Sequence, residues 1–142
     1  KWLGFRVIVN DDRNDLVSPE WIPNADAYLP GSIVDQLDQV RIDSQTYFLL
    51  LTRGVQFDVA ILPQLLDTEA AYIGVIGSKR RLATALKQLR DLGVSEEKLG
   101  RIHAPIGLEL NAETPEEIAV SIMAEIIMLR NQGTGKSMSN AQ

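Results

Sequence analysis

The strongest constraint on the fold of this chain is one stretch, residues 71–92. Residues 72–76, YIGVI, are a continuous apolar run with the length of a strand that is buried on both faces. Over residues 82–89, leucine and alanine recur at the spacing of one helical face. The sequence therefore predicts a strand that passes through a tight turn into a helix beginning near Ser78.

The turn between this strand and this helix carries cations where a helix does not favour them. Gly77 gives the backbone the freedom to turn, and the Ser78 hydroxyl can cap the helix. Lys79, Arg80 and Arg81 then place positive charge on the first turn, where the helix dipole is already positive. An anion on the free N–H groups would resolve this conflict, so we predict an anion site here. The alternative is a solvated basic helix start that an acid from another loop neutralises.

Two other predicted strands also end in polar residues. Residues 5–10 are rich in β-branched side chains and are followed by Asp11. A carboxylate at the end of a second strand is where a dinucleotide-binding fold holds a ribose hydroxyl, although aspartate is also common in any loop. Residues 45–52 contain the apolar run YFLLL and lead into a polar turn. The residues of that turn are Thr52, Arg53 and Gly54.

The remaining elements alternate between strand and helix. We expect helices over residues 31–40, 57–66, 94–100 and 115–129, a short strand at 25–29 and an extended segment over 101–107. Pro63 should limit or kink the second of these helices. The last helix is the clearest, because residues 114–117, TPEE, form a capping box with proline at the first helical position. Such alternation predicts a parallel α/β sheet, so Asp11 and both polar turns belong on the edge where ligands bind.

Length and charge narrow the class of protein. At 142 residues the chain fits one domain, which we place at residues 1–131, followed by a flexible Gly/Ser/Asn-rich tail at 132–142. A formal net charge of −5 argues against a nucleic-acid partner, which needs a basic face. No apolar run approaches the roughly 20 residues of a membrane span, and no signal peptide is visible. We therefore expect a cytoplasmic protein with no membrane partner.

The sequence has few groups suited to catalysis. With no cysteine, the chain has no disulfide, thiolate metal site, cysteine nucleophile or persulfide of its own. The single histidine, His103, lies two residues before a proline, and a lone histidine of this kind is more often a packed or solvated loop residue than a ligand or base. We assign no catalytic residue and no metal ligand, and the residues favour a binding module over an enzyme.

Three segments together resemble one known family. They are residues 72–80 (YIGVIGSKR), residues 101–108 (RIHAPIGL) and residues 112–119 (AETPEEIA) with Ser121 and Ile122. These segments resemble the C-terminal domain of the xanthine dehydrogenase accessory factors, the XdhC/CoxI family. The resemblance extends over nearly the whole chain, to about residue 130.

This resemblance implies a Rossmann-like, nucleotide-binding type of domain that acts as a molybdenum-cofactor chaperone. Such a protein binds the cofactor or its dinucleotide form, shelters it while a cysteine desulfurase provides sulfur, and delivers it to a xanthine dehydrogenase-type enzyme. We also expect a homo-oligomer. The phosphate of the cofactor would suit the basic turn. The cofactor-binding residues that we expect are Asp11, Thr52, Arg53, Gly54, Gly77, Ser78, Lys79 and Arg80.

The chain departs from the family pattern in two places. Val55 stands where the family usually has a histidine after Thr-Arg-Gly. The family domain also opens with a strand and a glycine-rich loop before a helix, whereas this chain begins at the end of that helix. We therefore expect an α/β fold with a Rossmann-like three-layer parallel sheet that lacks its first strand and glycine-rich loop, leaving two half-sheets with exposed edges.

The alternative function is a NAD(P)- or flavin-binding Rossmann oxidoreductase, because a fold alone does not decide between the two. Against this alternative, His103 is the only imidazole, and no Tyr-x-x-x-Lys spacing occurs. NAD(P) stays an alternative ligand to the molybdenum cofactor.

Overall fold

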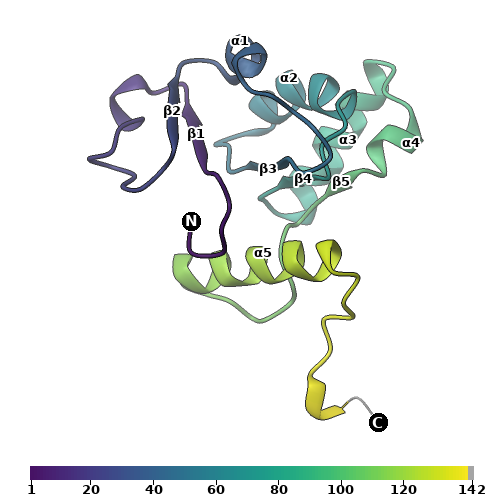
Figure 1. Cartoon of the computed structure of the whole chain (residues 1–142). Helices are drawn as coiled ribbons and strands as arrows, with labels where there is room; N and C mark the ends of the chain where they lie inside the picture. The colour runs from purple at the N-terminus through teal and green to yellow at the C-terminus, as the bar shows by residue number, and fades with distance from the viewer. Residues whose placement is uncertain (141–142) are drawn as a thin grey trace. The chain divides into compact units, whose positions relative to one another are not determined.

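The computed structural model describes residues 1–140, and their contacts divide the chain into two compact units, Lys1–Ile42 and Asp43–Gln142 (Figure 1). Each unit contains its own parallel sheet, so the expected pair of half-sheets is present. No helix within residues 1–140 is both long and apolar enough to cross a membrane.

The first unit is built on two parallel strands, β1 (Ile8–Asp11) and β2 (Ala27–Pro30). The short strand expected at residues 25–29 is β2. The side-chain amide of Asn10 fixes the strand pair, because it donates to the backbone oxygens of Leu29 and Gly31 at 2.6 and 2.9 Å. The remaining elements are η1 (Asn14–Leu16), α1 (Ile33–Gln36) and η2 (Leu37–Gln39), so the helix expected at residues 31–40 consists of two short pieces.

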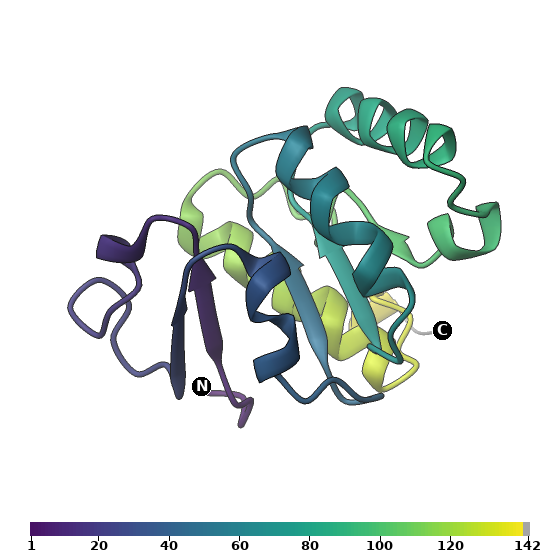
Figure 2. The ribbon, with the colours of Figure 1, turned by 90° about the horizontal axis from the view of Figure 1, so that it is seen from above.

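The second unit has three layers (Figures 1 and 2). Its sheet has the order β3 (Tyr47–Leu50), β4 (Tyr72–Val75), β5 (Ile102–His103), and all three strands are parallel. One face carries α2 (Val55–Leu66) and α3 (Lys79–Asp91), and the other carries α5 (Pro115–Arg130). The short elements α4 (Glu96–Leu99) and η3 (Met138–Asn140) complete it. The parallel α/β fold is confirmed; of the expected tail at 132–142, the last two residues lie outside the described part.

The core of the second unit lies around its central strand. All four residues of β4 are buried, as expected for a strand covered on both faces. Helix α2, which contacts both β4 and α3, contributes four nearly inaccessible side chains to the core, namely Ile61, Leu62, Leu65 and Leu66. Pro63 lies inside α2, and the helix continues past it to Leu66, the end that the sequence predicted, so the proline does not cut the helix short. Burial of the leucines on either side offsets the hydrogen bond that proline removes.

A part-buried polar contact joins the sheet to α5. The Tyr72 hydroxyl donates to Glu125 Oε2 at 2.5 Å, and the backbone N–H of Gly107 donates to the same oxygen at 3.0 Å. Burial, with the hydrogen bond to Glu125, raises the pKa of Tyr72 well above its usual value, so this hydroxyl stays a donor. The His103 ring stacks on Tyr72 with 4.6 Å between centroids. His103 is therefore a packed residue. The sequence had left open whether it is a packed or solvated residue or instead a ligand or base.

The Tyr72–Glu125 contact predicts a stability difference. Tyr72→Phe should lower the free energy of unfolding by about 1.5–3 kcal/mol, because Glu125 loses a part-buried hydrogen bond to its carboxylate. Glu125→Gln keeps an acceptor oxygen at this place and should lose less. Urea unfolding of both variants measures the difference. Equal losses, or no loss in Tyr72→Phe, would contradict this account.

Helix α5 begins with the predicted capping box. The Thr114 hydroxyl accepts from the backbone N–H of Glu117 at 3.2 Å. In return, Glu117 Oε2 accepts from the backbone N–H groups of Thr114 and Glu113 at 3.0 and 2.8 Å. These hydrogen bonds lower the pKa of Glu117. A carboxyl group with a lowered pKa stabilises the fold above its unfolded pKa, and this contribution disappears as the pH falls through the folded pKa.

A pH titration tests this cap. The unmutated chain should be more stable than Glu117→Gln near neutral pH, and the gap should close as the pH falls through the lowered pKa of Glu117, where the carboxyl group becomes protonated. Urea midpoints of the two proteins across the acid range measure the gap. Glu116→Gln, which removes the same charge from the same turn, is the control and should show a smaller effect. A gap that stays constant with pH would mean that the carboxylate charge is irrelevant.

Candidate anion site at the start of helix α3

The turn from β4 into α3 has the expected cap. Ser78 Oγ accepts from the backbone N–H of Arg81 at 3.2 Å, and the helix begins at Lys79. Gly77 has φ +146°, which side chains rarely tolerate, and a Cβ atom there would lie 2.9 Å from Arg81 Cδ. Glycine is therefore required for the turn and for the path of the Arg81 side chain.

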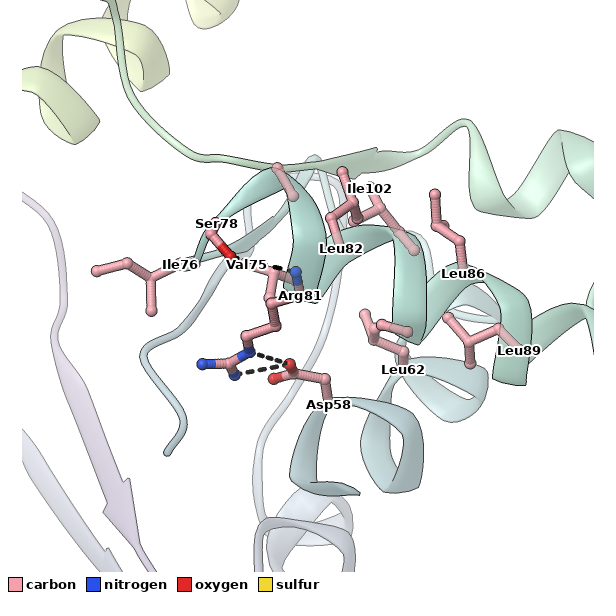
Figure 3. A pocket seen from close by; sticks show the side chains of 13 residues that line it. Asp58, Leu62, Val75, Ile76, Ser78, Arg81, Leu82, Leu86, Leu89 and Ile102 are labelled. Carbon is pink, nitrogen blue, oxygen red and sulfur yellow. Dashed lines mark hydrogen bonds and ion pairs between the residues drawn. The ribbon is translucent and has the colours of Figure 1, made fainter. Parts of the chain in front are cut away.

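The third cation of the turn, Arg81, points into the protein (Figure 3). Its Nε and Nη2 donate to Asp58 Oδ2 at 2.9 and 2.6 Å, and its Nη1 donates to the backbone oxygen of Thr52 at 2.9 Å. Nη2 also donates to the Thr52 hydroxyl, which in turn donates to Asp58 Oδ1. The Asp58 side chain is 0% exposed and that of Arg81 is 19% exposed. Arg81 is therefore neutralised by an acid, but one from the first turn of α2 and not from a loop.

Sequence reasoning missed Asp58, although one signal pointed to it. Asp58 precedes the buried face of α2, where Ile61, Leu62 and Leu65 recur at helical spacing. A charged residue on such a face needs a partner of opposite charge. The sequence alone does not say which of the nearby cations that partner is.

The first two cations of the turn point outward. Lys79 and Arg80 are exposed, and within residues 1–140 no hydrogen bond or ion pair engages either side chain. Their backbone N–H groups are the first two of the helix and have no intrahelical acceptor. The Ser78 hydroxyl accepts from Arg81 and keeps its own proton to donate. The turn thus offers N–H, O–H and cationic donors to an anion of the size of a phosphate.

The second polar turn lies beside the first. Strands β3 and β4 are adjacent and parallel, so the starts of α2 and α3 share one edge of the sheet. Thr52 contacts Arg81 directly, and Gly54 is the N-cap of α2. Arg53 is exposed, with its guanidinium carbon 4.8 Å from the centre of the Phe57 ring. The structure therefore brings seven of the eight expected site residues together; their role toward a cofactor stays a prediction.

The eighth expected residue, Asp11, lies in the first unit. Its Oδ1 accepts from the backbone N–H and Nε of Arg13, both at 2.9 Å, and its Oδ2 accepts from Nη2 at 2.8 Å. Arg13 holds the pKa of Asp11 far below its usual value, so Asp11 stays an ionised acceptor. Its place beside the residues of the second unit stays a prediction.

The interior beneath the turn is too small for a cofactor. A cavity of about 10 Å³ lies between α3 and strands β4 and β5, and most of the residues that line it are apolar (Figure 3). This volume holds about one water molecule. A ligand bound at this turn would therefore lie on its outer surface. Within residues 1–140, no group of three or more His, Cys, Asp or Glu residues is placed to hold a metal ion.

Comparison with known proteins identifies relatives in Escherichia coli and in Bacillus subtilis. Over 140 residues, which are 96% of this chain and 25% of the relative, the chain is 37% identical to the uncharacterized protein YqeB of Escherichia coli (strain K12). Over 129 residues it is 31% identical to a probable xanthine dehydrogenase subunit of Bacillus subtilis (strain 168), covering 91% of this chain and 37% of that protein. Over 90 residues it is 30% identical to the molybdenum cofactor insertion chaperone PaoD of Escherichia coli, covering 63% and 28% of the two chains. The chain thus spans about a quarter to two fifths of the length of these relatives.

A solved structure and a family model agree with these relatives. The crystal structure of a xanthine dehydrogenase from Bacillus halodurans matches 92% of this chain and 38% of its own, with a TM-score of 0.78 and 32% identity. Residues 1–126 match the model of the XdhC Rossmann domain. The expected resemblance is confirmed: the chain belongs to the XdhC family and carries its Rossmann domain.

Proposed function

We propose that this chain is an accessory module that binds molybdenum cofactor and supports its sulfuration and insertion into a xanthine dehydrogenase-type enzyme. The observation that carries the proposal is the start of α3, where Lys79 and Arg80 are exposed above free N–H groups and pair with no acid of the described residues 1–140. Molybdenum cofactor carries a phosphate, or a pyrophosphate in its dinucleotide form. The names of two relatives, a molybdenum cofactor insertion chaperone and a probable xanthine dehydrogenase subunit, support this cargo and this client.

The chemistry of the turn fits a phosphate group. A helix N-terminus favours an anion, and hydrogen bonds between ionised groups contribute about 1.5–3 kcal/mol each. Two such bonds from Lys79 and Arg80 change affinity by about two orders of magnitude or more. Ser78 can add a neutral hydrogen bond from its hydroxyl. Arg53, on the neighbouring turn, is the expected second source of positive charge for the rest of the ligand.

The absence of cysteine from this sequence fits a chain that holds the cofactor but carries no sulfur itself. Transfer of a sulfur atom from protein to cofactor proceeds through a cysteine persulfide, and this sequence has no cysteine. In the proposed function the chain holds the cofactor by its phosphate, while a separate cysteine desulfurase supplies the sulfur. The module then releases the cofactor to the molybdoenzyme. Holding by the phosphate leaves the metal end of the cofactor accessible to both partners.

Cofactor retention tests the proposal. In the full chain purified from cells that make the cofactor, Lys79→Ala with Arg80→Ala should lower the bound molybdenum and pterin at least about tenfold. Lys87→Ala with Lys136→Ala removes the same charge from exposed positions elsewhere and should retain the cofactor. Metal analysis and fluorescence of the oxidised pterin measure the content. Equal retention by the first variant and the unmutated chain would show that the cofactor lies elsewhere.

A further inference from the structure

Resting on the proposed function, we infer that Arg81, Asp58 and Thr52 form a positioning network that sets the phosphate affinity of Lys79 and Arg80 without contacting the phosphate. The inference assigns Thr52 a role different from the direct cofactor contact that the sequence suggested. It also divides the three consecutive cations of the turn by role: Lys79 and Arg80 contact the ligand, and Arg81 holds the turn in place.

The network joins three elements at one point. Thr52 follows β3, Asp58 lies in the first turn of α2, and Arg81 lies in the first turn of α3. Both oxygens of Asp58, both oxygens of Thr52 and all three nitrogens of the guanidinium group take part in the hydrogen bonds. Little donor capacity of Arg81 is therefore left for a ligand.

Asp58 opposes any movement of Arg81 toward a ligand. The Asp58 side chain is fully buried, and a buried carboxylate that loses its cation is strongly destabilising. Arg81 therefore stays with Asp58, and the phosphate is attracted by the two exposed cations alone. Because Arg81 and the two cations share one helical turn, fixing Arg81 fixes the direction of Lys79, Arg80 and their N–H groups. A site held in this way binds without first having to be ordered.

Gly77 is part of the same arrangement. Its φ of +146° lets the chain leave β4 and enter α3 within one residue of the cap. The missing Cβ leaves room for the aliphatic part of Arg81, which lies where a side chain on residue 77 would stand. Figure 3 shows the Arg81 side chain reaching from the start of α3 toward Asp58 on α2. The glycine thus serves the inward path of Arg81 as well as the turn.

Pyrophosphate binding by the full chain tests the inference. Asp58→Asn keeps the size of the side chain but releases Arg81 and adds one net positive charge near the turn. The positioning account predicts about tenfold weaker binding of pyrophosphate at about 0.15 M salt despite this added charge. The matched control is Asp91→Asn, which adds the same charge at the exposed far end of α3, roughly 18 Å away by the helical rise, and should leave the affinity unchanged within about twofold. The backbone amide signals of Lys79 and Arg80 in NMR spectra should shift or broaden in Asp58→Asn alone.

The outcomes separate the alternatives. Tighter binding by Asp58→Asn would mean that the released Arg81 is itself a ligand, and would overturn the inference while leaving the phosphate site in place. Unchanged affinity with only a lower melting temperature would reduce the network to a structural role and would also overturn it. No pyrophosphate binding by the unmutated chain would overturn the site and the inference together.

A second pair of variants keeps the test decisive if Asp58→Asn does not fold. Thr52→Val removes the hydroxyl that links Asp58 to Arg81 and leaves the net charge unchanged, so it should weaken pyrophosphate binding several-fold. Thr52→Ser restores the hydroxyl and should recover most of the affinity. Equal affinities of the valine and serine variants would overturn the inference.

Discussion

A buried ion pair between Arg81 and Asp58 is the interaction on which the candidate site depends. It links the first turns of α2 and α3, and Thr52 ties both to the end of β3. A fully buried carboxylate that loses its cation is strongly destabilising, so the pair fixes where α3 begins relative to α2. The orientation of Ser78, Lys79 and Arg80 follows from that, because they belong to the same helical turn. The Arg81–Asp58 contact beneath the turn therefore determines how the exposed donors at the start of α3 are oriented.

The parts of the fold that were predictable from sequence are those with local causes. The buried strand β4, the Ser78 cap and the capping box before α5 each depend on residues within a few positions of one another. Pro63 does not cut α2 short because burial of the leucines around it stabilises the helix, which is a tertiary effect. The helix predicted at residues 31–40 lies where it was expected, but it consists of two short pieces, α1 and η2.

Sequence reasoning predicted that the two polar turns lie side by side, but it did not predict how the charges of the basic turn are divided. Three adjacent cations after a strand indicated an anion site, and adjacent parallel strands placed the Thr52 turn beside it. Only the packing of α2 against α3 shows that the third cation belongs to Asp58, which lies 23 residues earlier. In the proposed function, a phosphate-bearing cofactor is the ligand of the two remaining cations.

A crystal structure of the chain with molybdenum cofactor bound would test the central claim most directly. The account predicts the cofactor phosphate within hydrogen-bonding distance of the backbone N–H groups of Lys79 and Arg80, with both side chains turned toward it and Arg81 still on Asp58. A phosphate bound away from the start of α3 would contradict the proposed site. A guanidinium group of Arg81 that leaves Asp58 for the phosphate would contradict the division of the three cations.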